Sequence, residues 1–153
     1  VNNAQINMVS APVIAKERGI NISTITQDKS GSFDGYIKIN VITETREKSV
    51  AGTVFSDGKP RFIQIKGINI DAEIGENMIY TTNKDLPGII GILGKTLGDN
   101  KINIANFTLG RASIGGEAIA LLSVDGSVSN AAIIAVKETN LFQQVKSLTF
   151  LVS

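Results

Sequence analysis

The hydrophobic and polar positions change their period near the middle of the chain. Between residues 20 and 74, apolar residues alternate with polar ones in runs such as "YIKINVIT" and "INIDAEI", and Gly- and Asp-rich segments separate these runs. Such alternation is typical of half-buried strands joined by tight turns. We therefore predict an antiparallel sheet with strands over residues 20–27, 36–43, 49–55, 61–67 and 68–74. The segment "DKSGSFDG" is predicted to be a loop, and the Asp-Gly pair of "SDGKP" a primed hairpin turn.

A short helix is predicted before this sheet. Ser10 can cap it, Pro12 falls in its first turn, where a missing N–H does no harm, and Gly19 suits its end. The helix is expected to cover one face of the sheet.

The second half of the chain has a helical period. After a strand over residues 77–82, apolar residues recur at the spacing of one helix face; they are Leu86, Ile89, Ile90, Leu93 and Leu97. Asp85 is the expected N-cap of this helix. Two strands, a second helix capped by Ser129 and a last strand follow. This order predicts an α+β protein with a ferredoxin-like unit. We place the domain boundary near Glu73–Glu76, between a domain over residues 1–74 and one over residues 75–153.

Composition excludes several classes of function. The chain has 153 residues, 42% of them hydrophobic, and a net charge of +1, so it can bury a core but has no electrostatic footprint for nucleic acid or an anionic membrane. It contains no His and no Cys, which excludes histidine-based triads, thiolate chemistry and the usual zinc sites. No apolar run approaches the roughly 20 residues of a membrane span. Because the chain opens on Val, we expect a fragment of a longer cytoplasmic protein.

The start of the first ferredoxin-like helix is a candidate amino-acid site. Free N–H groups there, from Leu86 to Gly88, suit a carboxylate, Asp85 can accept from an ammonium group, and Asn103 on the next strand can donate and accept. Equally, Asp85 can act only as a cap while Asn103 faces solvent. The letters "GIIGILGKT" match a phosphate-loop pattern, but they lie inside the helical period, which argues against nucleotide binding.

Basic residues mark a second candidate. Lys59 and Arg61 flank Pro60 after one turn, and Arg46 and Lys48 lie in the preceding turn. If these strand ends converge, they form an anion site for phosphate or carboxylate. A solvated basic rim is the favoured alternative.

The residues also resemble a known family. "NKDLPGIIGILGKTLGDNKINIANFTLGR" is similar to the ACT domain, an amino-acid-sensing module, through its D-x-P-G start and "INI" strand. "MVSAPVIAKERGI", "SVAGTVFSDGKPRFIQIKGINIDAE" and "NFTLGR" resemble the C-terminal region of long-form D-3-phosphoglycerate dehydrogenases, in which an allosteric substrate-binding (intervening) domain precedes the ACT domain. A missing strand before Val1 would leave an open edge in the first sheet.

The resemblance implies NAD-dependent oxidation of 3-phosphoglycerate by the parent enzyme, feedback inhibition by L-serine, and homo-oligomers paired through ACT domains. Neither a dinucleotide fingerprint nor a catalytic His is present, so no catalytic residue, metal or cofactor is expected in this chain. By motif position, serine would contact Asn83, Asp85, Leu86, Pro87, Gly88, Asn103 and Ile104 between two subunits. Asn83 stands where family members often have an aromatic residue. Arg61 matches a basic residue of the family's anion site, and Glu73 stands where another member of the family has a second basic residue.

Two alternatives stay open. The same region of an iron–sulfur L-serine dehydratase also joins a similar domain to an ACT domain. An ACT domain can also serve only to assemble an oligomer, without binding an amino acid.

Overall fold

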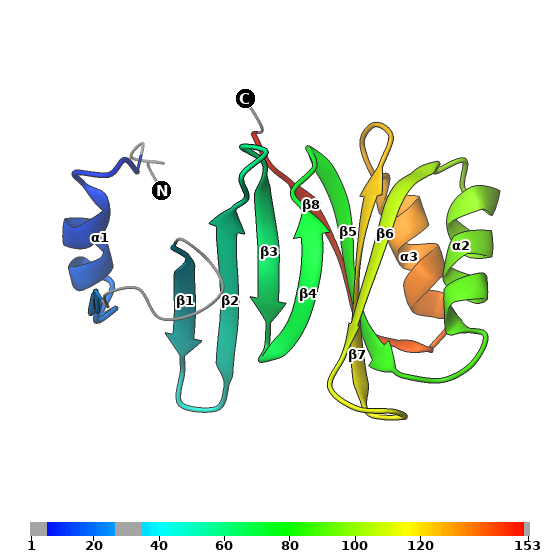
Figure 1. Cartoon of the computed structure of the whole chain (residues 1–153), viewed down its shortest axis with the longest axis horizontal. Helices are drawn as coiled ribbons and strands as arrows, with labels where there is room; N and C mark the ends of the chain where they lie inside the picture. The colour runs from blue at the N-terminus through cyan, green and yellow to red at the C-terminus, as the bar shows by residue number, and fades with distance from the viewer. Residues whose placement is uncertain (1–5, 27–34, 152–153) are drawn as a thin grey trace. The chain divides into compact units, whose positions relative to one another are not determined.

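The computed structural model describes residues 6–26 and 35–151. It forms two compact units, Val1–Asp34 and Gly35–Ser153, which are described separately. The first contains helix α1 (Ala11–Glu17), and the second contains eight strands and the helices α2 and α3 (Figure 1).

Helix α1 begins directly after Ser10, as predicted, but the Ser10 side chain does not cap it. The Asn7 Oδ1 atom accepts from the N–H groups of Val9 and Ser10, both at 2.9 Å, and Ser10 makes no side-chain cap. Ser10 therefore occupies the predicted N-cap position, but with helical backbone angles and without the side-chain hydrogen bond that a cap makes. Gly19 ends the helix with φ +71°, as predicted.

The predicted strand over residues 20–27 is not formed over residues 20–26. The apolar phase shifts between Ile22 and Ile25, so neither side of an extended chain would carry a continuous apolar face. Residue 27 and all but the last residue of the predicted loop lie outside the described residues.

The first sheet has the order β1-β2-β3-β4, and every pair is antiparallel. Its strands are β1 (Ile37–Ile42), β2 (Glu47–Val54), β3 (Pro60–Ile65) and β4 (Ile68–Glu73). The strand predicted over residues 36–43 was expected to be half-buried, but all six residues of β1 are exposed. The core of this sheet lies at β4, at the opposite edge from β1, so no core residue covers β1. Sequence alternation does not reveal which strand lies far from the core.

The primed turn lies one hairpin later than predicted. The Asp57-Gly58 pair sits in a longer loop between Val54 and Pro60, which are paired, with Gly58 at φ +79°. The two-residue turn joins β3 to β4, where Lys66 and Gly67 have φ +53° and +80°, as a type I′ turn requires.

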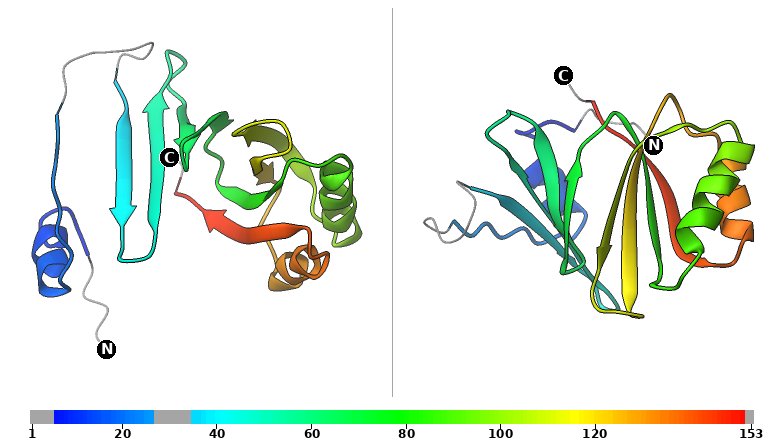
Figure 2. Two further views of the ribbon diagram at one scale, coloured as in Figure 1. Left: turned by 90° about the horizontal axis from the view of Figure 1, so that it is seen from below. Right: turned by 45° about the vertical axis from the view of Figure 1, so that its right-hand side comes forward.

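The second sheet has the ferredoxin-like arrangement predicted from the order of elements. Its strands β5 (Asn77–Lys84), β6 (Ile104–Arg111), β7 (Glu117–Val124) and β8 (Phe142–Thr149) lie in the order β6-β7-β5-β8, all antiparallel. Helices α2 (Ile89–Asp99) and α3 (Asn130–Glu138) cover one face (Figure 2). The core on this face includes Ile79, Leu93, Leu97, Leu122, Val136 and Val145. Ser129 caps α3 as predicted, accepting from the Ala132 N–H at 3.2 Å.

The other face of the second sheet packs against the first sheet. Their shared core contains Ile68, Ile70, Ala72, Met78, Ile119 and Leu121. Gly110 allows the close approach, because a Cβ atom there would lie 2.7 Å from the Asn69 carbonyl oxygen. The boundary placed at Glu73–Glu76 falls between β4 and β5 and stays a prediction.

Tyr80 lies half-buried beside this shared core and gives stability a pH dependence. Burial, aided by the charge of Glu117, raises the pKa of Tyr80 from 10.0 to about 12. Between these values the unfolded chain has lost the phenolic proton and the native chain has kept it, so the free energy of unfolding falls as pH rises. After discounting for solvent exposure, we expect a loss of about 1 kcal/mol from this group.

Urea unfolding of the wild type and of Tyr80→Phe, from about pH 9 to about pH 12, checks this expectation. The difference in unfolding free energy between the two proteins should shrink as pH rises, because only the wild type carries the phenol. Parallel pH profiles would contradict the assignment.

Candidate functional site

The residues before α2 are positioned by a bend between β5 and the helix. Gly88, with φ +85°, is the N-cap of α2, so the prediction that Asp85 caps this helix was wrong. Pro87 disfavours a helical conformation at Leu86, and the left-handed Gly88 delays the first turn. The helix therefore begins at Ile89.

Asp85 is held by groups that are distant in sequence. Its Oδ2 atom accepts from Arg111 Nη1 at 3.1 Å and from the Gly115 N–H at 3.3 Å. Its own N–H donates to the Gly116 carbonyl at 2.9 Å. Arg111 and the turn after β6 therefore form part of this site, and sequence reasoning missed both. Their signal was a basic residue and a Gly pair at the ends of two strands expected to be neighbours.

The helix start remains open beside Asp85. Leu86 is exposed, and Gly88 has open space where a Cβ would lie. The first N–H groups of an α-helix have no acceptor within the helix, so those of Ile89 and Ile90 can meet an anion. Asn83 is different: it is buried, and its amide donates to the Lys84 carbonyl at 2.6 Å.

Asn103 and Ile104 lie at the other end of the sheet. The Asn103 amide donates to the Asp125 carboxylate, just after β7, whereas Asp85 bonds to Gly116, just before β7. Eight residues of β7 separate the two points, and at about 3.3 Å per residue this is roughly 25 Å. The hypothesis that Asp85 and Asn103 of one chain hold the same ligand was therefore wrong.

The four residues of the predicted basic site also fall into two pairs that lie apart. Arg46 and Lys48 lie at the start of β2, whereas Lys59 and Arg61 follow its end, so the eight-residue strand keeps the pairs apart. The prediction that these ends converge was wrong, because the two turns lie at opposite ends of β2.

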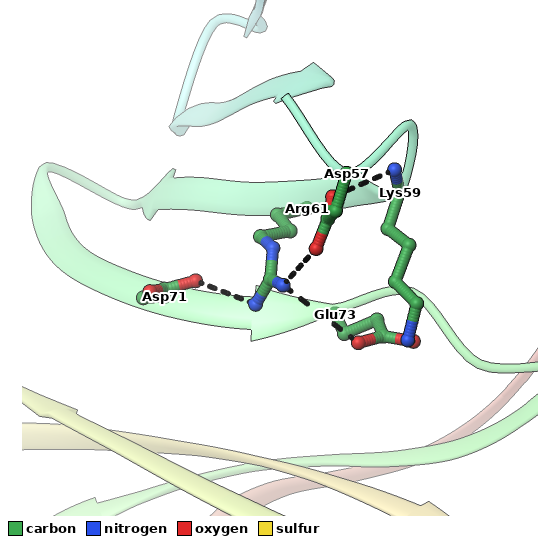
Figure 3. Close-up of polar contacts among 5 residues, drawn as sticks. All are labelled: Asp57, Lys59, Arg61, Asp71 and Glu73. Atoms are coloured by element: carbon green, nitrogen blue, oxygen red, sulfur yellow. Dashed lines mark hydrogen bonds and ion pairs between the residues drawn. The ribbon is translucent and has the colours of Figure 1, made fainter. Parts of the chain in front are cut away.

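Arg61 is surrounded by carboxylates (Figure 3). Its guanidinium lies 2.9 Å from Asp57, 3.4 Å from Asp71 and 3.8 Å from Glu73, while Lys59 pairs with Glu73 at 2.9 Å. The Lys59 backbone N–H and the Arg61 guanidinium hold the pKa of Asp57 below its usual value. The hydrogen bond to Asp57 raises the pKa of Arg61.

With three carboxylates around two cations, this cluster does not attract a further anion. Glu73, which the resemblance marked as a departure from a basic residue, is one of these carboxylates. The Asp71 partner could not be foreseen from sequence, because its approach depends on the pairing of β3 with β4. Asp57 approaches Arg61 from the loop between β2 and β3.

Other candidate chemistry finds no support in the part of the chain that the structure describes. The phosphate-loop letters lie mostly within α2, as the helical period predicted. Among residues 6–26 and 35–151, no group of three or more Asp, Glu, His or Cys side chains is placed so that it could hold a metal ion. No helix there has the length and hydropathy of a membrane span.

Comparisons with known proteins agree with the resemblance. Residues 1–66 match the D-3-phosphoglycerate dehydrogenase intervening domain. The D-3-phosphoglycerate dehydrogenase of Bacillus subtilis is 37% identical over 123 residues, which cover 80% of this chain and 23% of that protein. Those of Methanocaldococcus jannaschii and Synechocystis are 35% and 32% identical over 88% and 79% of this chain, and over 25% and 22% of their own lengths.

The chain thus spans about a quarter of the length of the curated relatives it matches. The match runs beyond the intervening domain into the ferredoxin-like unit, because it covers four-fifths of the chain. The chain belongs to the D-3-phosphoglycerate dehydrogenase family.

Proposed function

We propose that residues 75–153 are an ACT regulatory domain that binds L-serine between two copies of the chain. The whole protein would be a cytoplasmic, NAD-dependent D-3-phosphoglycerate dehydrogenase, oxidising 3-phosphoglycerate to 3-phosphohydroxypyruvate. NAD would bind outside this chain, and serine, the end product of the pathway, would act as a feedback inhibitor.

The observation that carries this proposal is the position of β6 at an edge of its sheet. If two β6 strands pair antiparallel about a two-fold axis, the start of one lies beside the end of the other. Asn103 and Ile104 of one chain would then approach Arg111 of the partner chain, and Arg111 holds Asp85. The pairing thus unites the two half-sites that a single chain keeps about 25 Å apart.

Exposed apolar side chains support pairing on this side. Leu86 is 53% exposed, Ile90 49% and Leu109 39%, although all three are large and apolar. They belong to the α2 region and to β6, so a second copy meeting the β6 edge would cover apolar surface as well as strand backbone.

The chemistry of the joined site suits a small amino acid. The α2 start would receive the carboxylate, Asp85 the ammonium group, and Asn103 of the partner chain the side-chain hydroxyl. Arg111 already occupies Asp85 Oδ2, so the ammonium group would bind Oδ1 or displace the guanidinium.

A purely structural role is the second candidate. Asp85 is paired with Arg111 and Asn103 with Asp125 within one chain, as polar groups would be in an assembly that holds no ligand. The iron–sulfur L-serine dehydratase alternative has lost support, because the relatives named above are D-3-phosphoglycerate dehydrogenases.

Calorimetric titration of the chain with L-serine tests the proposal, with glycine and D-serine as controls and sedimentation analysis of the same sample. We expect L-serine to bind to a dimer, with much weaker binding of both controls. A folded dimer that binds none of the three would contradict serine regulation and favour the structural role. A folded monomer would contradict the paired site.

A further inference from the structure

An apolar cleft of about 260 Å³ opens between the two sheets. Ile39, Val41 and Val50 line it on the first sheet, and Tyr80 and Leu148 line it on the second. Ile39 and Val41 are more than half exposed. Exposed aliphatic side chains that face a concave surface are typical of a ligand site rather than of ordinary surface.

A polar pocket of about 340 Å³ continues from this cleft. Lys48, Lys66 and Gln144 line both, so the two are contiguous, and Arg46 lines the polar pocket. Glu47 is the carboxylate that lines it.

The polar pocket keeps an excess of positive charge. Lys66 forms an ion pair with Glu117, whereas Arg46 and Lys48 have no ion pair among the described residues. With Glu47 counted, the lining still favours an anion.

Thr82 adds an unpaired donor to the polar pocket. Its side chain is fully buried, and its hydroxyl has no hydrogen-bond partner in the described part of the chain. Because Thr82 lines the pocket, a ligand oxygen there could accept from this hydroxyl.

We propose that the cleft and the polar pocket form one site for a small amphiphilic anion, an unbranched fatty carboxylate of about ten carbons. Its alkyl chain would lie along Val50 and Leu148, and its carboxylate among Arg46, Lys48 and Thr82.

The length of the ligand follows from the strand register. Leu148 pairs with Met78 and Gln144 with Thr82, so the site extends over four residue steps of β8. At about 3.3 Å per step this is roughly 13 Å, and a zigzag of about ten carbons with bonds near 1.5 Å spans it.

A second copy of the chain is a poorer occupant. Two-fold pairing would press together two copies of a face that carries Lys48 and Lys146, and the like charges would oppose that contact. The site also lies near β8, at the edge of the second sheet opposite β6, so it is independent of the proposed serine site.

Decanoate below its micellar concentration is the probe, followed by calorimetry and by amide chemical shifts. Decanol, which lacks the charge, and acetate, which lacks the long alkyl chain, are the controls. We expect decanoate to bind best and to shift the resonances of Val50, Thr82 and Leu148. Equal binding of decanol, shifts elsewhere, no binding to the folded chain, or self-association that excludes decanoate would each overturn the proposal.

Matched variants locate the ligand. Lys48→Glu should weaken decanoate binding about tenfold, because it reverses a charge at the carboxylate, whereas Lys38→Glu on the other face of β1 should not. Val41→Asp should abolish binding, while Ile42→Asp, at the next and more exposed position, should leave it unchanged. Equal effects within either pair would overturn the proposal.

Discussion

Asp85→Ala is expected to weaken L-serine binding by about 10- to 100-fold, if the paired ACT site is correct, because it removes a carboxylate from the ligand's ammonium group. The variant should stay folded. Gly88, not Asp85, caps α2, and the Asp85–Arg111 pair is partly exposed, with Asp85 22% and Arg111 53% accessible. Such an exposed ion pair contributes about 0.2–1 kcal/mol to the free energy of unfolding.

Asp99→Ala is the matched control. Asp99 pairs with Lys95 on the exposed side of α2, so this change removes the same charge away from the site. Calorimetric titration of both variants with L-serine distinguishes the loss of a direct contact with the ligand from the change in net charge of the chain. If Asp85→Ala and Asp99→Ala bind serine equally well, Asp85 does not touch the ligand.

Mixing variants tests whether the site is shared between chains. Asn103→Ala should also lose serine binding, but in a mixed dimer with Asp85→Ala one of the two sites carries both native residues. Equal mixing with random exchange should restore about a quarter of the sites. A mixture that stays inactive, after exchange of subunits is shown, would exclude a site built from two chains.

Gly110→Ala is expected to lower the free energy of unfolding by about 3 kcal/mol, the upper end of the usual cost of overpacking. The new Cβ would lie 2.7 Å from the Asn69 carbonyl oxygen and 3.0 Å from Ile68 Cγ2. Because the first contact is with backbone, no side-chain rotation relieves it. Denaturant unfolding measures the loss.

The control is the same substitution where space is open. Gly94 lies within α2, and no atom of another part of the chain comes within 4 Å of the point that a Cβ would occupy. Gly94→Ala should therefore stabilise the chain by about 0.5–1 kcal/mol through helix propensity. If both variants shift unfolding in the same direction, the contact between β6 and β4 is looser than the distances indicate.

The sequence predicted those parts of the fold that depend on local period. Leu93 and Leu97 repeat at helical spacing and are fully buried, and Ser129 caps its helix. The order of strands and helices predicted the second sheet. The period did not show that Leu86 and Ile90, on the same predicted stripe, would be exposed, because that depends on where α2 begins and which flank of it the sheet covers.

The site was harder to predict, because its geometry depends on pairing between distant segments. Asp85 meets Arg111, which is 26 residues away, through the hairpin that joins β6 to β7. Asn103 lies at the far end of the same hairpin. In the same way, the basic residues near Arg61 gave no sign that Asp71 would face the guanidinium across the pairing of β3 with β4.

The left-handed Gly88 changes what the D-x-P-G letters mean as a signature. The space around Gly88 is open, so crowding does not exclude a side chain; the positive φ does, at roughly 1–2 kcal/mol for an ordinary L-residue. Two of the motif's letters, Pro87 and Gly88, therefore encode a bend from strand to helix. A sequence search with this motif therefore finds proteins that share the bend. A search for proteins that bind an amino acid at the proposed site would also have to include the positions of Arg111 and Asn103.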